Sequence, residues 1–314
     1  MTVILVATTA MNPQIIIQKL DNFQRKHHFT AFSYAVIKRY GEHQAGYQAA
    51  LLTYYAFLAL FPLLLVLTTF TQIIAGSHPA LQAKVVTAVA SYFPVIGNQL
   101  SAHVHSLHKS GLALAIGTLF LFYGTRGVAA AFRYGVNIIW HVPESEQPGF
   151  PQSTLQNLAI VLAGAFGLTA AAIVTGAVAA NFSGLSAHLS VGVINLVILF
   201  FLISFILQRS LPRRISTRDK QLAALTAAIG LVVLQLAGGY ILARVFKNLD
   251  ALYSYFALSL GLLFWVYLQA QVLYYAVEIS AVHSQKLWPR SLSGQHLTEA
   301  DTRLKTSGPN HTSN

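Results

Sequence analysis

The stretch AALLTYYAFLALFPLLLVL, residues 49 to 67, decides the fold of this chain. It lies inside a run from His43 to Ala83 that contains no Asp, Glu, Lys or Arg. About 20 apolar residues are enough to cross the hydrocarbon core of a bilayer, so this run predicts a transmembrane helix. Pro62 removes one backbone hydrogen bond and predicts a kink in that helix. The kink either opens a cavity beside Tyr54 and Tyr55 or only shapes the helix.

Composition places the whole chain in the membrane class. Of its 314 residues 55% are hydrophobic and 9% are charged, and the mean hydropathy is +0.57. Soluble domains carry about 25% charged residues, which excludes that class. The chain has no cysteine, so disulfides, thiolate metal sites and cysteine nucleophiles are excluded as well.

Five further apolar runs follow the first. The predicted fold is therefore all-α, a polytopic membrane protein with a bundle of six transmembrane helices and interfacial amphipathic helices. We divide the chain into a cytoplasmic segment (1–44), a six-helix domain (45–282) and a disordered cytoplasmic tail (283–314). The predicted spans are 45–74, 111–131, 155–180, 189–207, 221–243 and 253–282.

The segment before the first span is basic and amphipathic. The first ten residues lack a basic n-region, which argues against a cleaved signal peptide, and either Met1 or Met11 can be the start. Residues 12–45 predict either a helix lying on the inner membrane surface or a short helix packed on the bundle. Its apolar residues recur at helical spacing: Phe29, Phe32, Val36, Ile37 and Tyr40.

The loop between the first two spans, residues 75–110, is long. An apolar stripe from Leu81 to Phe93 predicts an amphipathic helix in the outer interface. The loop's four histidines have no nearby carboxylate and no ligand spacing, so we interpret them as solvated and predict neither a metal nor another cofactor. Aromatic residues near span ends are interpreted as interface anchors: Tyr92, Phe93, Trp140, Trp265 and Trp288.

Basic residues set the orientation. With both termini inside, 15 of the 20 Lys and Arg residues fall in cytoplasmic segments and four outside, with Arg126 in a span. This asymmetry fits the positive-inside rule. It also accounts for the net charge of +11 without nucleic acid as a partner, because the basic loops face anionic lipid of the inner leaflet. The loop at 209–220 and the tail could also dock a protein partner or a second copy.

Three segments carry a resemblance to a known family. The first span resembles the opening helix of the YihY / virulence factor BrkB family of bacterial inner-membrane proteins. LLFWVYLQAQVLYYAVEIS (262–280) resembles its last helix with the Ala-x-Glu ending, and FRYGVNIIWHVP (132–143) is similar to the motif after its second span. Where the family often has Asn shortly after the glutamate, this chain has Ser280, so a role for that amide does not transfer.

The resemblance implies a six-helix protein of the bacterial cytoplasmic (inner) membrane with both termini in the cytoplasm. It implies little about activity. The family was long labelled a ribonuclease, a label widely regarded as mistaken, and other members have been tied to serum resistance or export of envelope lipid.

Two ionisable residues lie inside predicted spans, Arg126 and Glu278. A charge within a membrane is costly and is a functional hypothesis by default. Both lie about 6–8 Å from the inner end of their predicted spans at 1.5 Å per residue, so they could pair. With Gln271, Tyr54 and Tyr55 they form a predicted polar cluster in the cytoplasmic half. Alternatively, Arg126 snorkels to the interface, or the last span ends before Glu278.

Three functions are compared. The first is movement of a lipid, envelope component or small solute, without a nucleotide-binding motif to drive it. The second is a non-catalytic scaffold or a subunit of a complex. The third is a nuclease, which needs clustered carboxylates or histidines to hold catalytic cations. With nine acidic residues and none clustered in the bundle, we expect no enzyme.

Overall fold

The computed structural model describes residues 21–74, 111–164, 167, 184–246, 254–292 and 297–307. The regular elements within these ranges are helices, which confirms the all-α prediction for this part of the chain. Residues 21–26 and 152–164 are also helical. The named elements are α2 (His28–Glu42), α3 (Ala45–Ile74), α6 (Gly111–Ile139), the 3-10 turn η2 (Glu144–Glu146), α8 (Gly184–Ser210), α9 (Thr217–Phe246), α10 (Ser254–Gln285) and α11 (Glu299–Ser307).

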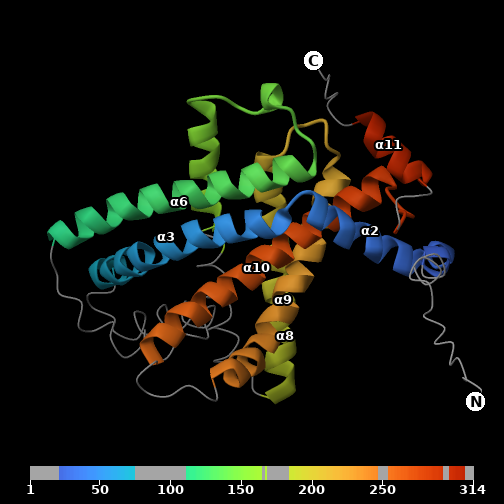
Figure 1. Cartoon of the computed structure of the whole chain (residues 1–314). Coiled ribbons are helices and arrows are strands. Elements are labelled where there is room, and N and C mark those ends of the chain that lie inside the picture. The colour runs from blue at the N-terminus through green and yellow to red at the C-terminus, as the bar shows by residue number, and fades with distance from the viewer. Residues whose placement is uncertain are drawn as a thin grey trace, which may run out of the picture.

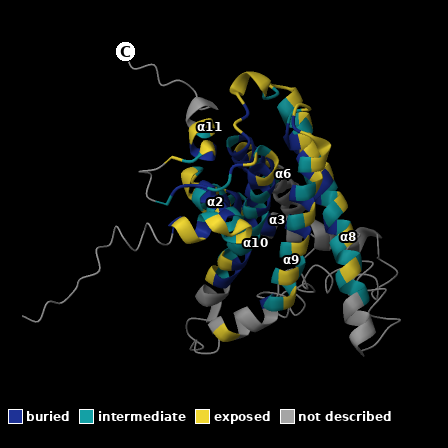
Figure 2. Cartoon of the chain, turned by 90° about the vertical axis from the view of Figure 1, so that its right-hand side faces the viewer, coloured by how far each residue is buried: buried dark blue, intermediate teal, exposed yellow. Residues whose placement is uncertain are grey.

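Three helices of the described chain are long and apolar enough to cross a membrane. The candidate spans are Ser190–Ser210 in α8, Thr217–Gly238 in α9 and Ser259–Gln285 in α10. Large hydrophobic side chains remain exposed on α8 and α9, among them Phe201 and Leu236 (Figure 2). Exposed apolar surface of this kind is typical of contact with lipid or another protein. The helices α3 and α6 are of similar length, at 30 and 29 residues.

Helix α10 lies at the centre of the bundle. It contacts α2, α3, α6 and α9, while α3 packs along α6 (Figure 1). Its Trp265 and Tyr274 are fully buried. The interpretation of Trp265 and Trp140 as interface anchors is therefore wrong, because both side chains pack inside the protein. Their large rings contribute apolar contact area to the core, where aromatic side chains stabilise a fold most strongly.

A glycine permits the close approach of α3 and α6. A Cβ atom added at Gly124 would lie 3.0 Å from the Cβ of Ala59 and 3.1 Å from its Cα. The two backbones are therefore nearly in contact, which only small residues allow. Not every glycine has this role, because a Cβ added at Gly164 would meet nothing within 4 Å.

Helix ends gather at one end of the bundle. We call this the α2 end; it comprises α2, the last turns of α6 and α10, residues 140–156, the α8–α9 turn at 211–216, and residues 286–292 and 297–307. Hydrogen bonds cross it: Arg214 donates to the carbonyl of His141 (3.2 Å), and the Ser280 hydroxyl donates to the carbonyl of Asp219 (2.6 Å). All segments that the charge pattern places inside, so far as they are described, lie here.

Helix α2 packs against α10 with one face. Val36 and Tyr40 of the predicted apolar stripe are buried, whereas Phe29 and Ile37 are exposed. The helix therefore packs on the bundle, as one of the two interpretations predicted, and contact of its exposed face with a membrane surface stays a prediction. A two-residue turn, His43 and Gln44, separates α2 from α3, and Gln44 has a positive φ of 51°.

The tail after residue 283 differs from its predicted disorder. Residues 284–292 and 297–307 are ordered, and α11 lies beside α2 in Figure 1. Leu287 and Val282 pack against Ala35 and Val36 of α2 in a small apolar cluster. The polar composition of the tail suggested disorder, but a few apolar and charged residues are enough to fix it on the bundle.

Candidate functional site

The carboxylate of Glu278 lies in the interior at the α2 end. Glu278 is 0% exposed and lies two turns before the end of α10. Its Oε2 is 3.4 Å from the Nε of Arg39, which is itself 1% exposed. An ion pair this deep has lost its contact with water, so each charge depends on the other for compensation.

Arg39 connects three helices. It extends from the last turn of α2 to Glu278 on α10, and its Nη2 donates to the carbonyl of Ile139, 3.1 Å away, at the end of α6. The last four carbonyls of a helix have no partner within the helix, and Arg39 satisfies one of them. Burial lowers the pKa of Arg39 below its ordinary value, and the neighbouring Glu278 opposes this shift.

His43 is the second partner of the carboxylate. The Nδ1 of His43 contacts Oε1 of Glu278, and the His43 side chain is 11% exposed. The His43 ring in turn meets His141 edge-on, with 5.1 Å between the ring centroids. His141 is exposed, so two imidazole rings lead from the buried carboxylate to the surface. Imidazole nitrogens can donate or accept hydrogen bonds, so the carboxylate has a polar connection toward the surface. We call Arg39, His43 and Glu278 the Glu278 site.

The predicted pair of Arg126 with Glu278 is not formed. The Arg126 side chain is exposed on α6, and the partners of Glu278 are Arg39 and His43. The sequence placed Arg126 and Glu278 at similar distances from the inner ends of their spans. That comparison was wrong, because α6 does not end at residue 131 but continues to Ile139. Arg126 lies about 20 Å from that end and Glu278 about 10 Å from the end of α10, at 1.5 Å per residue.

The other residues of the predicted cluster lie apart from the carboxylate. Tyr54 is exposed and Tyr55 half-buried on α3, with 5.3 Å between their ring centroids. Gln271 is half-buried on α10. Pro62 lies within α3, which is one helix throughout, and its side chain lies outside the described residues, so the kink stays a prediction.

Gln271 is instead a neighbour of Tyr40. Tyr40 stacks on Tyr275 with 3.9 Å between the ring centroids. Burial, together with Tyr267 and Tyr275, raises the pKa of Tyr40 to about 12, and Gln271 opposes the shift. The Tyr40 hydroxyl therefore stays protonated and is a potential donor on the residue that follows Arg39.

Sequence reasoning missed Arg39 and His43. Both precede the first predicted span, so neither was considered as an intramembrane group. One signal was available: Arg39 lies directly beside Tyr40 and three residues after Val36, on the apolar stripe of α2. A base on the apolar face of a helix predicts a buried acidic partner.

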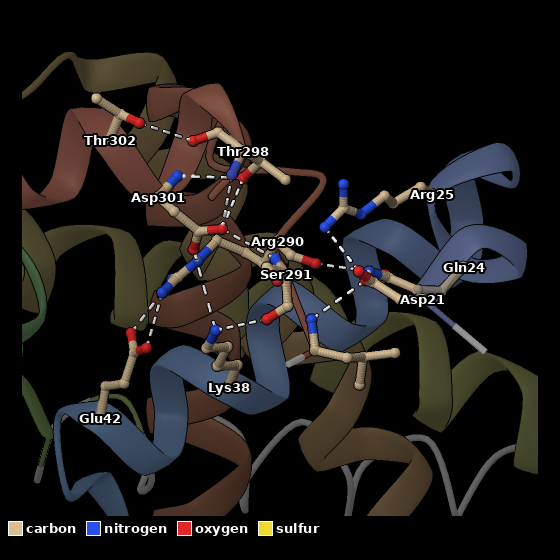
Figure 3. Close-up of polar contacts among 11 residues, drawn as sticks. Asp21, Gln24, Arg25, Lys38, Glu42, Arg290, Ser291, Thr298, Asp301 and Thr302 are labelled. Carbon is tan, nitrogen blue, oxygen red and sulfur yellow. Dashed lines mark hydrogen bonds and ion pairs between the residues drawn. The ribbon is translucent and has the colours of Figure 1, made fainter. Parts of the chain in front are cut away.

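A second ionic cluster ties the tail to the N-terminal helices (Figure 3). Arg290 binds Glu42 with two nitrogens, at 2.7 and 3.2 Å, and its Nε lies 2.5 Å from Asp301. Lys38 donates to the carbonyl of Ser291 at 2.8 Å. We call Glu42, Arg290 and Asp301 the terminal clamp. It holds α11 and α2 together at the α2 end, and its Arg290 and Asp301 are buried.

An all-α chain with several helices of membrane length and an ion pair buried where they converge has the architecture of a polytopic membrane protein. The sequence pattern of the Virulence factor BrkB family matches residues 36–300. The chain therefore belongs to this family, which confirms the resemblance seen in its helices.

One relative is a UPF0761 membrane protein of Acinetobacter baylyi. It is 26% identical over 291 residues, which cover 88% of this chain and 68% of the relative. No solved structure matches the chain. The region that matches the family pattern, residues 36–300, includes Arg39, His43 and Glu278.

Proposed function

We propose that the chain is a six-span protein of the bacterial inner membrane with both termini in the cytoplasm. The lengths of α3 and α6 support two spans beyond the three candidates. Successive spans alternate in direction, so both termini and the loops after the second and fourth spans must lie on one side of the membrane. The segments predicted to be inside gather at the α2 end, which supports the proposed orientation. The relative's description as a membrane protein supports the location.

Within that membrane, the protein is proposed to move a lipid, an envelope component or a small solute. The observation that carries this proposal is Glu278, an acid fully buried on the central helix and connected through His43 to the exposed His141. Loss of the contact between Glu278 and Arg39 would loosen the packing of α2 on α10. Buried ionisable groups that can exchange protons are typical of transport pathways.

A vesicle assay tests this proposal. Purified protein is reconstituted with phosphatidylglycerol or phosphatidylethanolamine that carries a fluorescent head group, and movement between leaflets is followed by quenching from outside. The same vesicles report leakage of trapped solutes. We expect movement above protein-free vesicles, reduced at least about tenfold in Glu278→Gln, which keeps the shape of the side chain but removes its charge.

Arg126→Gln is the matched control, because it removes an exposed charge from a neighbouring helix. Equal loss in both variants would contradict a specific role for the Glu278 site. Folded protein that moves neither lipid nor solute would contradict transport itself.

The second candidate is a scaffold. It is favoured by the packing of the Glu278 site, where an arginine bridges three helices, and by the terminal clamp at the same end of the bundle. On this proposal the ion pair only fixes helix positions and the α2 end docks a protein partner. Co-purification of a partner in equal amount, without flux, would favour it.

We also propose that the protein is not an enzyme. Among the described acidic residues, Glu42, Glu278 and Asp301 are bound to basic side chains rather than to one another. A metal-dependent nuclease needs acidic oxygens turned toward a shared cation.

A further inference from the structure

A cavity of about 830 Å³ lies at the α2 end, separate from the Glu278 site. It is open to one side and lined by the last turn of α6, the segment 142–156 and residues 208–213 at the end of α8. Ligand sites of proteins commonly have volumes of about 300–1,000 Å³. Its position beside the end of the candidate span Ser190–Ser210 is where a lipid head group would lie if α8 crosses the membrane.

The lining of this cavity favours an anion that also forms hydrogen bonds. Four glutamines and two arginines face it. The one acid in the lining, Glu146, is already bound to Arg214 at 2.8 Å. The lining side chains used in this argument are Gln147, Gln152, Gln156, Gln208, Arg209 and Arg213.

Asn137 supplies the second observation. It lies in the last turn of α6, lines the cavity and is 3% exposed, yet its Oδ1 has no hydrogen-bond partner among the described residues. A buried polar atom without a partner is costly, so its presence beside a cavity indicates a group that binds there. An acceptor oxygen in this position selects a ligand with a hydroxyl or amine donor.

Both walls of the cavity are held by buried bases. The Nζ of Lys220 donates to the carbonyls of Leu211 and Pro212, at 3.3 and 2.9 Å, and fixes the turn after α8. The Nη1 of Arg133 donates to Oδ1 of Asn157 at 2.9 Å and fixes the helix 152–164 against α6. The cavity is therefore formed before any ligand arrives, which lowers the entropic cost of binding.

We propose that this cavity binds a phosphate-bearing head group that also carries hydroxyl donors. Arg209 and Arg213 bind the phosphate, and Asn137 accepts a hydrogen bond from a hydroxyl. Arginine is suited to this role because its planar fork matches phosphate oxygens. The same chemistry is present in an anionic phospholipid and in a free phosphate compound. The site would serve a transporter and a scaffold alike.

Binding to the purified full chain in neutral detergent tests the proposal. The probes are short-chain phosphatidylglycerol, phosphatidylcholine, glycerol phosphate and inorganic phosphate. Bound probe is counted by native mass spectrometry, and its apparent affinity is taken from the increase in melting temperature. We expect phosphatidylglycerol to bind the native chain more tightly than phosphatidylcholine, which has a phosphate but no hydroxyl donor.

Three variants locate the site. Arg213→Gln and Asn137→Leu should each weaken binding at least about tenfold, as expected for a lost hydrogen bond to a charged or buried group. Arg218→Gln is the matched control, because it removes the same charge from the same basic segment without lining the cavity. If Asn137→Leu does not fold, the site is tested by comparing Arg213→Gln with Arg218→Gln, since only the first should weaken binding.

Each outcome bears on the proposal. Glycerol phosphate that binds as tightly as the lipid, with the same variant pattern, supports the site and identifies a free phosphate compound as its ligand. Tighter binding of the lipid identifies a membrane ligand. Equal losses in Arg213→Gln and Arg218→Gln, or no binding of any probe to the native chain, would overturn the proposal.

Discussion

At the scale of single residues, the charge of Glu278 is balanced by partners of two kinds. Arg39 offers a buried guanidinium, whereas His43 offers a ring nitrogen from the turn between α2 and α3. A buried ion pair contributes little net stability compared with apolar side chains of the same size. Removal of one partner, however, leaves an uncompensated charge. The two residues should therefore be strongly coupled.

This coupling can be measured with an apolar replacement. Arg39→Met should lower the free energy of unfolding by about 3–5 kcal/mol, because Glu278 stays buried without its main partner. Arg39→Met combined with Glu278→Met should recover most of that loss. Thermal denaturation in detergent provides the comparison, with Arg126→Met as the exposed control. Additive losses in the double variant would show that the pair is not coupled.

Asp301 gives the terminal clamp a defined dependence on pH. Burial alone would raise the pKa of Asp301. Hydrogen bonds from the Ser291 N–H, the Arg290 guanidinium and Thr298 outweigh it and hold the pKa at about 2, below the usual 3.8. Because the folded-state pKa is the lower one, the stabilising contribution of Asp301 is complete above about pH 4. It is lost as the pH falls toward 2.

Release of α11 should follow the same pH range. Pepsin cleavage within residues 297–307 should begin between about pH 4 and pH 2 in the native chain. Asp301→Asn, which cannot carry the charge, should be cleaved already at about pH 4. Identical profiles for the two proteins would show that other contacts hold α11.

At the scale of elements, α6 and α10 end in the same way. At the end of α6, the Val142 N–H donates to the carbonyl of Asn137 and the His141 N–H donates to the carbonyl of Ile138. At the end of α10, the Leu287 N–H donates to the carbonyl of Val282 and the Lys286 N–H donates to the carbonyl of His283. These are paired bonds of the Schellman type, which require a left-handed residue and favour glycine there. His141 and Lys286 occupy that position with φ of 49° and 50°.

Glycine at the end of α10 should therefore stabilise the protein. Lys286 is exposed, and relief of the left-handed conformation in Lys286→Gly should add up to about 1 kcal/mol to the free energy of unfolding. Lys286→Ala keeps the strained conformation and is the control. The melting temperatures of Lys286→Gly and Lys286→Ala, measured in the same detergent as the native chain, test this expectation. A lower melting temperature for the glycine variant would mean that the Lys286 side chain itself is needed.

At the scale of the whole molecule, the sequence predicted long apolar helices better than the contacts between them. The predicted first and last spans, 45–74 and 253–282, nearly coincide with α3 and α10. Hydropathy determines such helices because their backbone groups must be satisfied within the segment. Glu278 was found by the same reasoning, as a charge inside an apolar run.

The partners of Glu278 could not be found in this way. Arg39 and His43 lie on a segment that folds back against α10, and a pattern along one chain does not show which segment covers which. The order of the tail was missed for the same reason. Only the tertiary structure shows that Arg290 contacts both Asp301 and Glu42. Pairing across more than 200 residues is a property of the tertiary structure.

The two ends of the chain should therefore loosen together. Arg290 joins α2 to the tail, and α2 also carries Arg39 to Glu278. In Arg290→Gln, amide hydrogen exchange should rise at least about tenfold in both α2 and α11, since each loses an anchor, while α8 and α9 remain protected. Arg303→Gln, which affects an exposed pair with Glu299, is the control. Faster exchange confined to α11 would mean that the bundle fixes α2 on its own and that the tail is only attached to it. Faster exchange in both helices would connect the tail to the buried carboxylate, so that a molecule bound to the tail could affect the Glu278 site.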